Sequence, residues 1–182
     1  MRYLLVILTI VLLWGCGEPE PRKPIQVKSG SFFKASIERS KQLLIKEEEL
    51  IKKIIDKDTT SQYFMSDTGF WYKYHLKNEV SEYQLRTDDE VLLQYAVLNF
   101  NGDTIYSEQD IGIVQHAIDK SQLFPGLRNA VKLLKEGEKA TFLFPSSQAY
   151  GYKGDNNKIG PGTPIATSLE LLKIIKKQDS LN

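Results

Sequence analysis

The chain has 182 residues, of which 41% are hydrophobic and 26% are charged. These proportions are ordinary for a globular protein, and the length suits one domain with additional segments. The formal net charge of +1 gives no support for binding to nucleic acid or to an acidic partner. We therefore expect one globular domain with extra segments and no nucleic-acid partner.

The N-terminus has a basic start followed by a nearly unbroken apolar run from Leu4 to Trp14. This run is shorter than the roughly 20 residues that a membrane-spanning helix needs. A basic start before a short apolar segment is typical of a secretory signal. We predict that residues 1–15 are a signal peptide and that the mature protein lies outside the cytoplasm.

The apolar run stops at Leu13-Trp14-Gly15-Cys16, and Cys16 is the only cysteine, so no intrachain disulfide can form. The sequence here resembles the bacterial lipobox. That resemblance implies that Cys16 becomes the N-terminus and carries palmitate or a similar acyl chain. Each buried methylene contributes roughly 0.8 kcal/mol, so several acyl chains anchor a protein stably. The expected location is the cell envelope, as a membrane-anchored lipoprotein on the periplasmic face or at the cell surface.

Proline recurs at short intervals through Gly17–Pro24. Because proline prevents a helix and favours an extended spacer, residues 16–30 are predicted to tether the domain to the membrane. Glu18 and Glu20 fit a solvated linker. The alternative is a signal that sorts the protein to the cell surface.

Between Ser31 and Ile55 the apolar residues recur at helical spacings, which predicts an amphipathic helix that the polar residues 56–61 end. The stripe consists of Leu43, Leu44, Leu50, Ile51, Ile54 and Ile55. It would either pack on the chain's own domain or pair the helix 31–55 with a second copy or with a motility or secretion partner. Both alternatives stay open, because a sustained heptad is absent.

From Phe64 the periodicity changes to two, and Phe70–Leu76 alternates as a half-buried strand does. Further strands are predicted at Glu90–Phe100, Thr104–Tyr106 and Ile111–Ile118. Asn101-Gly102 supplies the positive φ angles of the hairpin turn between the first two of these.

The two histidines of the chain give no support for a metal site. His75 lies on the polar side of its predicted strand and is expected at the surface. His116 lies in another strand-like run and is expected to be a packing or surface residue. We therefore expect neither a metal nor a cofactor.

A second helix is predicted to open at Leu123-Phe124-Pro125-Gly126-Leu127. Leu127, Val131 and Leu134 share one face of it, and Gly137 is expected to end it. Strands follow at Lys139–Phe144 and Ile165–Ile175, with a turn-rich loop at 154–164 between them. The order indicates an α+β fold, in which antiparallel strands form a twisted sheet and one short helix covers a face of it.

Several motifs in this order resemble the FKBP-type peptidyl-prolyl cis-trans isomerases. They are Leu93-Gln94-Tyr95, Asn101-Gly102, Leu123-Phe124-Pro125-Gly126-Leu127, Leu133–Glu138, Phe144-Pro145, Ala149-Tyr150-Gly151 and Leu169–Leu172. The resemblance covers roughly Asp67–Ile175. It implies a strongly curved sheet wrapped around the short helix and an activity on proline-containing polypeptide clients. The lipobox, the N-terminal helix and the aromatic strand at Trp71 resemble more narrowly the gliding-motility-associated FKBP-like lipoproteins of Bacteroidetes.

The resemblance also implies the site. Tyr150, Tyr95 and Phe124 would be the catalytic residues, with the Tyr150 hydroxyl and the Phe124 N–H donating to the bound peptide. Leu127 would form the floor. The remaining substrate-binding residues would be Ile105, Val114, Leu123 and Ile159. The predicted organisation is a signal peptide at 1–15, lipidated Cys16 with a tether at 16–30, the helix at 31–60, the FKBP-like domain at 61–177 and a tail at 178–182.

The chain departs from the family pattern at several positions. Tyr106 stands where the family usually has an aspartate, so the usual pocket acid is missing from this position. Val114 and Thr167 stand where bulky aromatic residues are common, and Leu127 replaces a common tryptophan. Two hypotheses follow. The protein is either an isomerase that assists the folding of exported proteins, or a weakly active or inactive binding module that holds partner proteins.

Overall fold

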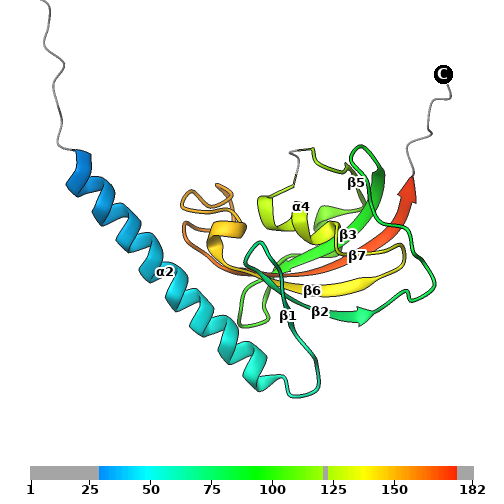
Figure 1. Cartoon of the computed structure of the whole chain (residues 1–182), viewed down its shortest axis with the longest axis horizontal. Helices are drawn as coiled ribbons and strands as arrows, with labels where there is room; N and C mark the ends of the chain where they lie inside the picture. Colours follow the sequence, from blue (N-terminus) through cyan, green and yellow to red (C-terminus); the bar gives the residue numbers. More distant parts are fainter. Residues whose placement is uncertain (1–28, 121–122, 176–182) are drawn as a thin grey trace, which may run out of the picture. The chain divides into compact units, whose positions relative to one another are not determined.

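The computed structural model describes residues 29–120 and 123–175 of the chain (Figure 1). The chain divides into two compact units, Met1–Ala35 and Ser36–Asn182. Of the first unit, only the start of helix α2 (Ser29–Lys57) is described. The predicted signal peptide, Cys16, the tether up to residue 28 and the tail at 178–182 lie outside the described residues. Within the described ranges, no helix is both long and apolar enough to cross a membrane.

The second unit is built on one antiparallel sheet, which confirms the predicted α+β class. The strands are β1 (Phe64–Met65), β2 (Trp71–Leu76), β3 (Glu90–Leu98), β4 (Thr104–Tyr106), β5 (Val114–Ala117), β6 (Lys139–Phe144) and β7 (Ile165–Ile175). Their order is β1-β2-β6-β7-β3-β4, and β5 pairs with β3. The sheet curves beneath the short helix α4 (Pro125–Val131) (Figure 1).

The helix α4 is shorter than the sequence predicts. It ends at Val131 instead of Gly137, and the chain continues in turns in which Leu133 N donates to Ala130 O and Leu134 N donates to Val131 O. Leu134 is nevertheless buried, because these turns keep it on the face of Leu127 and Val131. Gly137 instead occupies a later turn with φ of 80°, where its N–H donates to Leu171 O at 2.7 Å.

A helical turn that the sequence prediction missed, α3 (Glu108–Ile111), precedes β5. The segment Ile111–Ile118 was predicted as a continuous strand, but β5 covers only Val114–Ala117. A capping box begins α3, because the Ser107 side chain accepts from Asp110 N and the Asp110 carboxylate accepts from Ser107 N. That Ser-x-x-Asp spacing was the available signal.

The main core lies between α4 and the sheet and is rich in aromatic rings. Phe70, Phe142 and Phe144 are fully buried, and the rings of Phe142 and Phe144 stack with centroids 5.9 Å apart. The half-buried Tyr72 stacks on Phe142 at 5.7 Å. Alternation along β2 and β6 directs these side chains to one face of the sheet.

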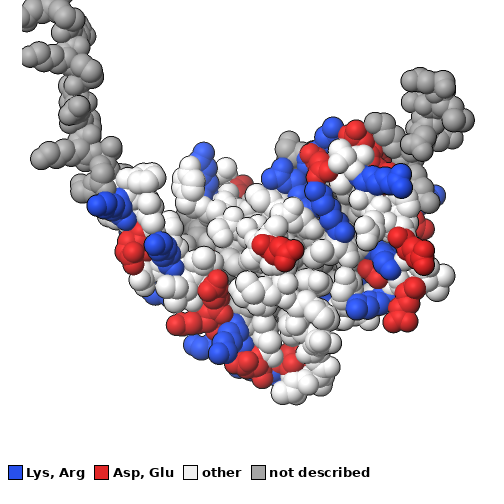
Figure 2. Space-filling model, viewed as in Figure 1, with Lys and Arg blue, Asp and Glu red and all other residues white. Residues whose placement is uncertain are grey.

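Helix α2 covers part of the opposite face. Its Ile51 is fully buried and packs with Leu143 and Ala166, whose neighbours in β6 and β7 point into the main core. This confirms packing on the chain's own domain for Ile51, Ile54 and Ile55 of the stripe, whereas Leu50 in the same half of the helix is exposed. Pairing with a second copy or a partner stays a prediction for the N-terminal half, where Ile37, Leu43 and Ile45 are exposed. Figure 2 shows charges of both signs mixed along α2.

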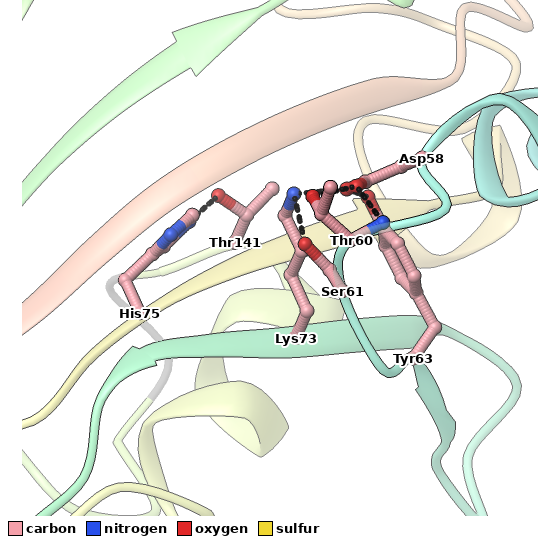
Figure 3. A network of polar contacts seen from close by, with 7 residues as sticks. All are labelled: Asp58, Thr60, Ser61, Tyr63, Lys73, His75 and Thr141. Carbon is pink, nitrogen blue, oxygen red and sulfur yellow. Dashed lines mark hydrogen bonds and ion pairs between the residues drawn. The ribbon is translucent and has the colours of Figure 1, made fainter.

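A polar network joins the end of α2 to β2 (Figure 3). The Lys73 ammonium donates to Asp58 and, at 3.2 Å, to Ser61 Oγ, and the Tyr63 hydroxyl also donates to Asp58. The Lys73 hydrogen bond, followed by that of Thr60, holds the pKa of Asp58 well below its usual range. On the same strand His75 is exposed, as predicted, and its Nε2 pairs with Thr141 Oγ1 at 2.8 Å.

Candidate functional site

The structure brings the predicted site residues together in one apolar cluster, although they come from separate segments. Tyr95 lies on β3, Ile105 on β4 and Val114 on β5, whereas Leu127 lies on α4. Leu123 and Phe124 precede α4, Tyr150 follows the short turn η1 (Ser146–Gln148), and Ile159 lies in the loop before β7. All of them belong to the main core cluster or pack against it.

Burial divides these residues into a floor and a margin. Leu123, Phe124, Leu127 and Ile159 are buried. By contrast, Tyr95, Ile105, Val114 and Tyr150 are only partly buried and pack against the cluster from its edge. The edge therefore exposes aromatic and aliphatic surface that a ligand can contact, above a base that excludes water.

Close approach of α4 to β6 fixes Phe124 against Tyr150. The Phe124 ring lies edge-on to Phe144 at 5.3 Å and tilted against Tyr150 at 5.1 Å between centroids. Gly126 makes this approach possible, because a Cβ there would lie 2.5 Å from the Phe144 ring and 2.7 Å from Gln148 O. The Pro125-Gly126 pair therefore starts the helix and also allows it to touch the strand.

The Tyr150 hydroxyl is a protonated donor at neutral pH. Burial, followed by the nearby Tyr95, Asp155 and Tyr106, raises the pKa of Tyr150 to about 12. No hydrogen bond joins this hydroxyl to another residue of the described ranges, so it is available to a ligand carbonyl.

Sequence reasoning missed Asp155, which contributes a carboxylate to the edge of the cluster beside Tyr106. The Tyr106 hydroxyl donates to Asp155 Oδ2, while Asp155 Oδ1 accepts from Asn157 N and Ile159 N at 2.8 Å each. The usual acid is absent from position 106, as the sequence says, but the fold supplies one from the loop before β7. The signal in the sequence was Gly154-Asp155-Asn156, a typical side-chain-capped turn.

The hydrogen bonds of Asp155 keep it ionised. Burial acts to raise its pKa, but the bonds from Tyr106, Ile159 and Asn157 outweigh burial and lower the pKa below its usual value. The same bond raises the pKa of Tyr106. The Lys158 ammonium lies 4.8 Å from the centroid of the Tyr106 ring and donates to Ile105 O at 3.1 Å. These contacts attach the loop at Asp155–Ile159 to β4.

Two other predicted positions are plain packing residues. Thr167 is fully buried in β7, and its hydroxyl finds no partner within the described ranges. Alternation along β7 places Thr167 on the same face as Ile165 and Leu169, which belong to the main core. His116 is also buried, which agrees with the expected packing role. The described ranges hold no group of three or more metal-ligating side chains.

Comparison with known proteins agrees with this geometry. The family model described as "FKBP-type peptidyl-prolyl cis-trans isomerase" matches residues 82–172, half of the 182-residue chain. A curated relative, "Probable FKBP-type peptidyl-prolyl cis-trans isomerase FkpA" of Neisseria meningitidis serogroup B, is 30% identical over 118 residues. That match covers 65% of this chain and 43% of the relative, so it spans less than half of the relative's length.

Solved structures support the same fold. The crystal structure of FkpA from Escherichia coli is 18% identical with a TM-score of 0.59, and the match covers 97% of this chain and 83% of that one. A peptidyl-prolyl cis-trans isomerase from Pseudomonas syringae pv. tomato is also 18% identical with a TM-score of 0.59. That match covers 75% of this chain and 96% of the other. The chain belongs to the FKBP-type peptidyl-prolyl cis-trans isomerase family.

Proposed function

We propose that this protein is a peptidyl-prolyl cis-trans isomerase that assists the folding of exported, proline-containing polypeptides. One observation carries the proposal. Tyr150, Phe124 and Leu127 converge on a single apolar cluster, inside the part of the chain that matches the isomerase family. The client's proline would contact the buried floor, and its flanking residues would contact the partly exposed margin.

Such a cluster can lower the barrier to rotation about an X–Pro bond. The barrier is roughly 18–20 kcal/mol because rotation breaks the resonance of the amide, and the uncatalysed reaction takes tens to hundreds of seconds. The twisted amide is less polar than the planar one. A dry apolar surface of Phe124, Leu127 and Ile159 therefore stabilises the transition state relative to the ground state.

Hydrogen bonds would hold the peptide while the bond turns. The Tyr150 hydroxyl, which stays protonated because its pKa is raised to about 12, would donate to a carbonyl of the client. The Phe124 N–H would be a second donor. Fixed donors of this kind reduce the entropy lost in reaching the transition state. This chemistry requires no metal, nucleophile or general base.

The test is the kcat/KM of the purified full-length protein in detergent, measured with a Leu-Pro peptide in a protease-coupled assay. Tyr150→Phe should lower kcat/KM by roughly three- to tenfold, the value of one hydrogen bond. Tyr72→Phe is the matched control, because Tyr72 is also half-buried against the main core but lies away from Phe124. If the wild-type protein does not accelerate isomerisation at all, the proposal is wrong.

The second candidate function is a binding module that holds partner proteins and turns over slowly. One observation favours it: the N-terminal half of α2 exposes apolar residues such as Ile37 and Ile45. Deleting the helix would remove core residue Ile51, so substitution is the better test. Ile37→Lys with Ile45→Lys should abolish partner recovery from envelope fractions. Unchanged recovery would contradict this candidate.

We also propose that the protein is a lipoprotein of the cell envelope, of the gliding-motility-associated kind found in Bacteroidetes. The lipobox at Leu13–Cys16, the Pro-rich spacer and the N-terminal helix support this. Cys16→Ala should abolish incorporation of labelled palmitate and move the protein from the membrane fraction to the soluble fraction. If the variant still carries label, Cys16 is not the lipidated residue.

A further inference from the structure

A groove runs between α2 and the segment that carries Tyr150. Its walls include Leu43, Leu44 and Glu47 of α2, with Ser146, Gly151 and Tyr152 opposite, and its volume is about 570 Å³. This volume lies within the roughly 300–1,000 Å³ of ligand sites. Leu43 and Leu44 are 40% and 38% exposed, so apolar surface is open to solvent along the helix side of the groove.

Glu47 places a nearly buried carboxyl group in the wall of this groove, with one of its two oxygens unpartnered in the described ranges. The side chain is only 2% exposed. Its Oε2 accepts from Ser146 N at 2.9 Å, whereas Oε1 is buried and has no partner among residues 29–120 and 123–175. A buried carboxylate oxygen without a donor is costly, and native structures rarely leave one. A ligand that brings a donor into the groove would remove this cost.

The groove adjoins the isomerase site because both use one short segment. Ser146 and Gly151 line the groove, and Tyr150 between them packs against Phe124. The hydrogen bond from Gly151 N to Ser146 O, at 2.8 Å, closes this segment into a turn. One short turn therefore joins Tyr150 of the isomerase site to the wall of the groove.

We propose that this groove is a second binding site for the client polypeptide, and that it takes a lysine or arginine side chain flanked by apolar residues. The proposal rests on the proposed isomerase function, since it assigns the same client to both sites. A cationic donor would form a charge-assisted hydrogen bond with Glu47 Oε1, the strong class of such bonds. The methylene stem of that side chain and its apolar neighbours would cover Leu43 and Leu44.

The experiment measures the binding of matched fluorescent peptides to the full-length protein by anisotropy. Each peptide carries one Leu-Pro bond, a flexible spacer and either Leu-Lys-Leu or Leu-Gln-Leu, placed before the proline in one pair and after it in another. We expect the Lys peptide of at least one pair to bind roughly tenfold more tightly than its Gln partner. Glu47→Gln, which keeps an acceptor for Ser146 N, should abolish that preference.

A second variant tests the groove without changing a buried residue. Leu44→Lys adds a like charge at the edge of the groove and should weaken binding of the Lys peptide. Leu50→Lys adds the same charge to an exposed position of α2 (45% exposed) that does not line the groove, and should leave the preference unchanged.

The outcomes separate this inference from the isomerase function. A wild-type protein that isomerises a short Leu-Pro peptide but shows no Lys preference overturns the inference alone. A wild-type protein that prefers the Lys peptide but does not accelerate isomerisation of the Leu-Pro bond overturns the isomerase function alone. If Leu44→Lys instead dissociates a dimer in sedimentation experiments and no Lys preference is seen, a second copy occupies the groove and the inference is wrong.

Discussion

At the scale of single residues, the pair Tyr106–Asp155 changes the expected character of the isomerase site. The Tyr106 hydroxyl takes the position of the family's usual acid and donates to an ionised carboxylate from another segment. The site edge therefore keeps a negative charge, although the residue after Ile105 is neutral. Substituting Tyr106→Asp would place a second carboxylate against Asp155, so it should not restore the family's arrangement.

The carboxylate can be tested directly. Asp155→Asn should lower kcat/KM several-fold, because it weakens the bond from Tyr106 and the turn that positions Ile159. Asp67→Asn, in an exposed turn before β2, is the matched control. The stability that ionised Asp155 contributes should be complete above its unfolded pKa near 4. Because the folded pKa is lower, this contribution is lost as the pH falls further. Melting curves of both variants at pH 7 and pH 3 would check the sign.

At the scale of elements, the loop before β7 acts as one wall of the site, and glycine determines its shape. Gly154 has φ of +71°, and a Cβ there would lie 2.1 Å from Ile159 O. The turn that contains Asp155 therefore excludes any side chain at 154. At Gly160 the nearest atom to a built Cβ, Thr163 Oγ1, lies at 3.6 Å, an ordinary contact distance.

These two glycines form a matched pair. Gly154→Ala should displace Ile159 and Asp155, lower the melting temperature and reduce kcat/KM, because both the backbone angle and the space oppose a side chain. Gly160→Ala should leave both quantities nearly unchanged. Equal effects of the two substitutions, measured by thermal melting and by the peptide assay, would show that the loop does not have this conformation.

At the scale of the whole molecule, the buried His116 links stability to pH. Burial, followed by the charge of Arg128, lowers the pKa of His116 below its usual value, and its Nδ1 has no partner within the described ranges. The folded protein therefore holds this imidazole neutral. As the pH falls through the unfolded pKa near 6.5, the unfolded chain takes up the proton first and stability decreases.

Replacing the imidazole should remove that dependence. His116→Leu should show a smaller loss of melting temperature between pH 7.5 and 5.5 than the wild type. His75→Gln should also reduce the slope, because burial, followed by the charges of Lys73 and Lys139, lowers the pKa of His75 too. The reduction should be smaller, since His75 is more exposed than His116. A His116→Leu protein with the wild-type slope would mean that other groups carry the pH dependence.

Local sequence was sufficient for most of the elements. The strands at Thr104–Tyr106, Lys139–Phe144 and Ile165–Ile175 have the predicted bounds, because alternation and turn residues report a strand without reference to its partners. The motif around Phe124 and Tyr150 likewise identified the family. The predicted end of α4 at Gly137 was wrong, because Gly137 lies in a later turn whose N–H donates to Leu171 O. The local sequence carries no signal for such a contact between distant segments.

The sequence by itself determined the fold class and the order of strands along the chain, because periodicity and turn chemistry are local properties. The site residues came from the resemblance to the family and stay a prediction. Only the tertiary structure decided which residues share a surface. It brought Asp155 to Tyr106 and Glu47 to Ser146, and it divided α2 into a packed half and an exposed half. These depend on long-range packing, in which burial and hydrogen bonding between remote segments fix each position.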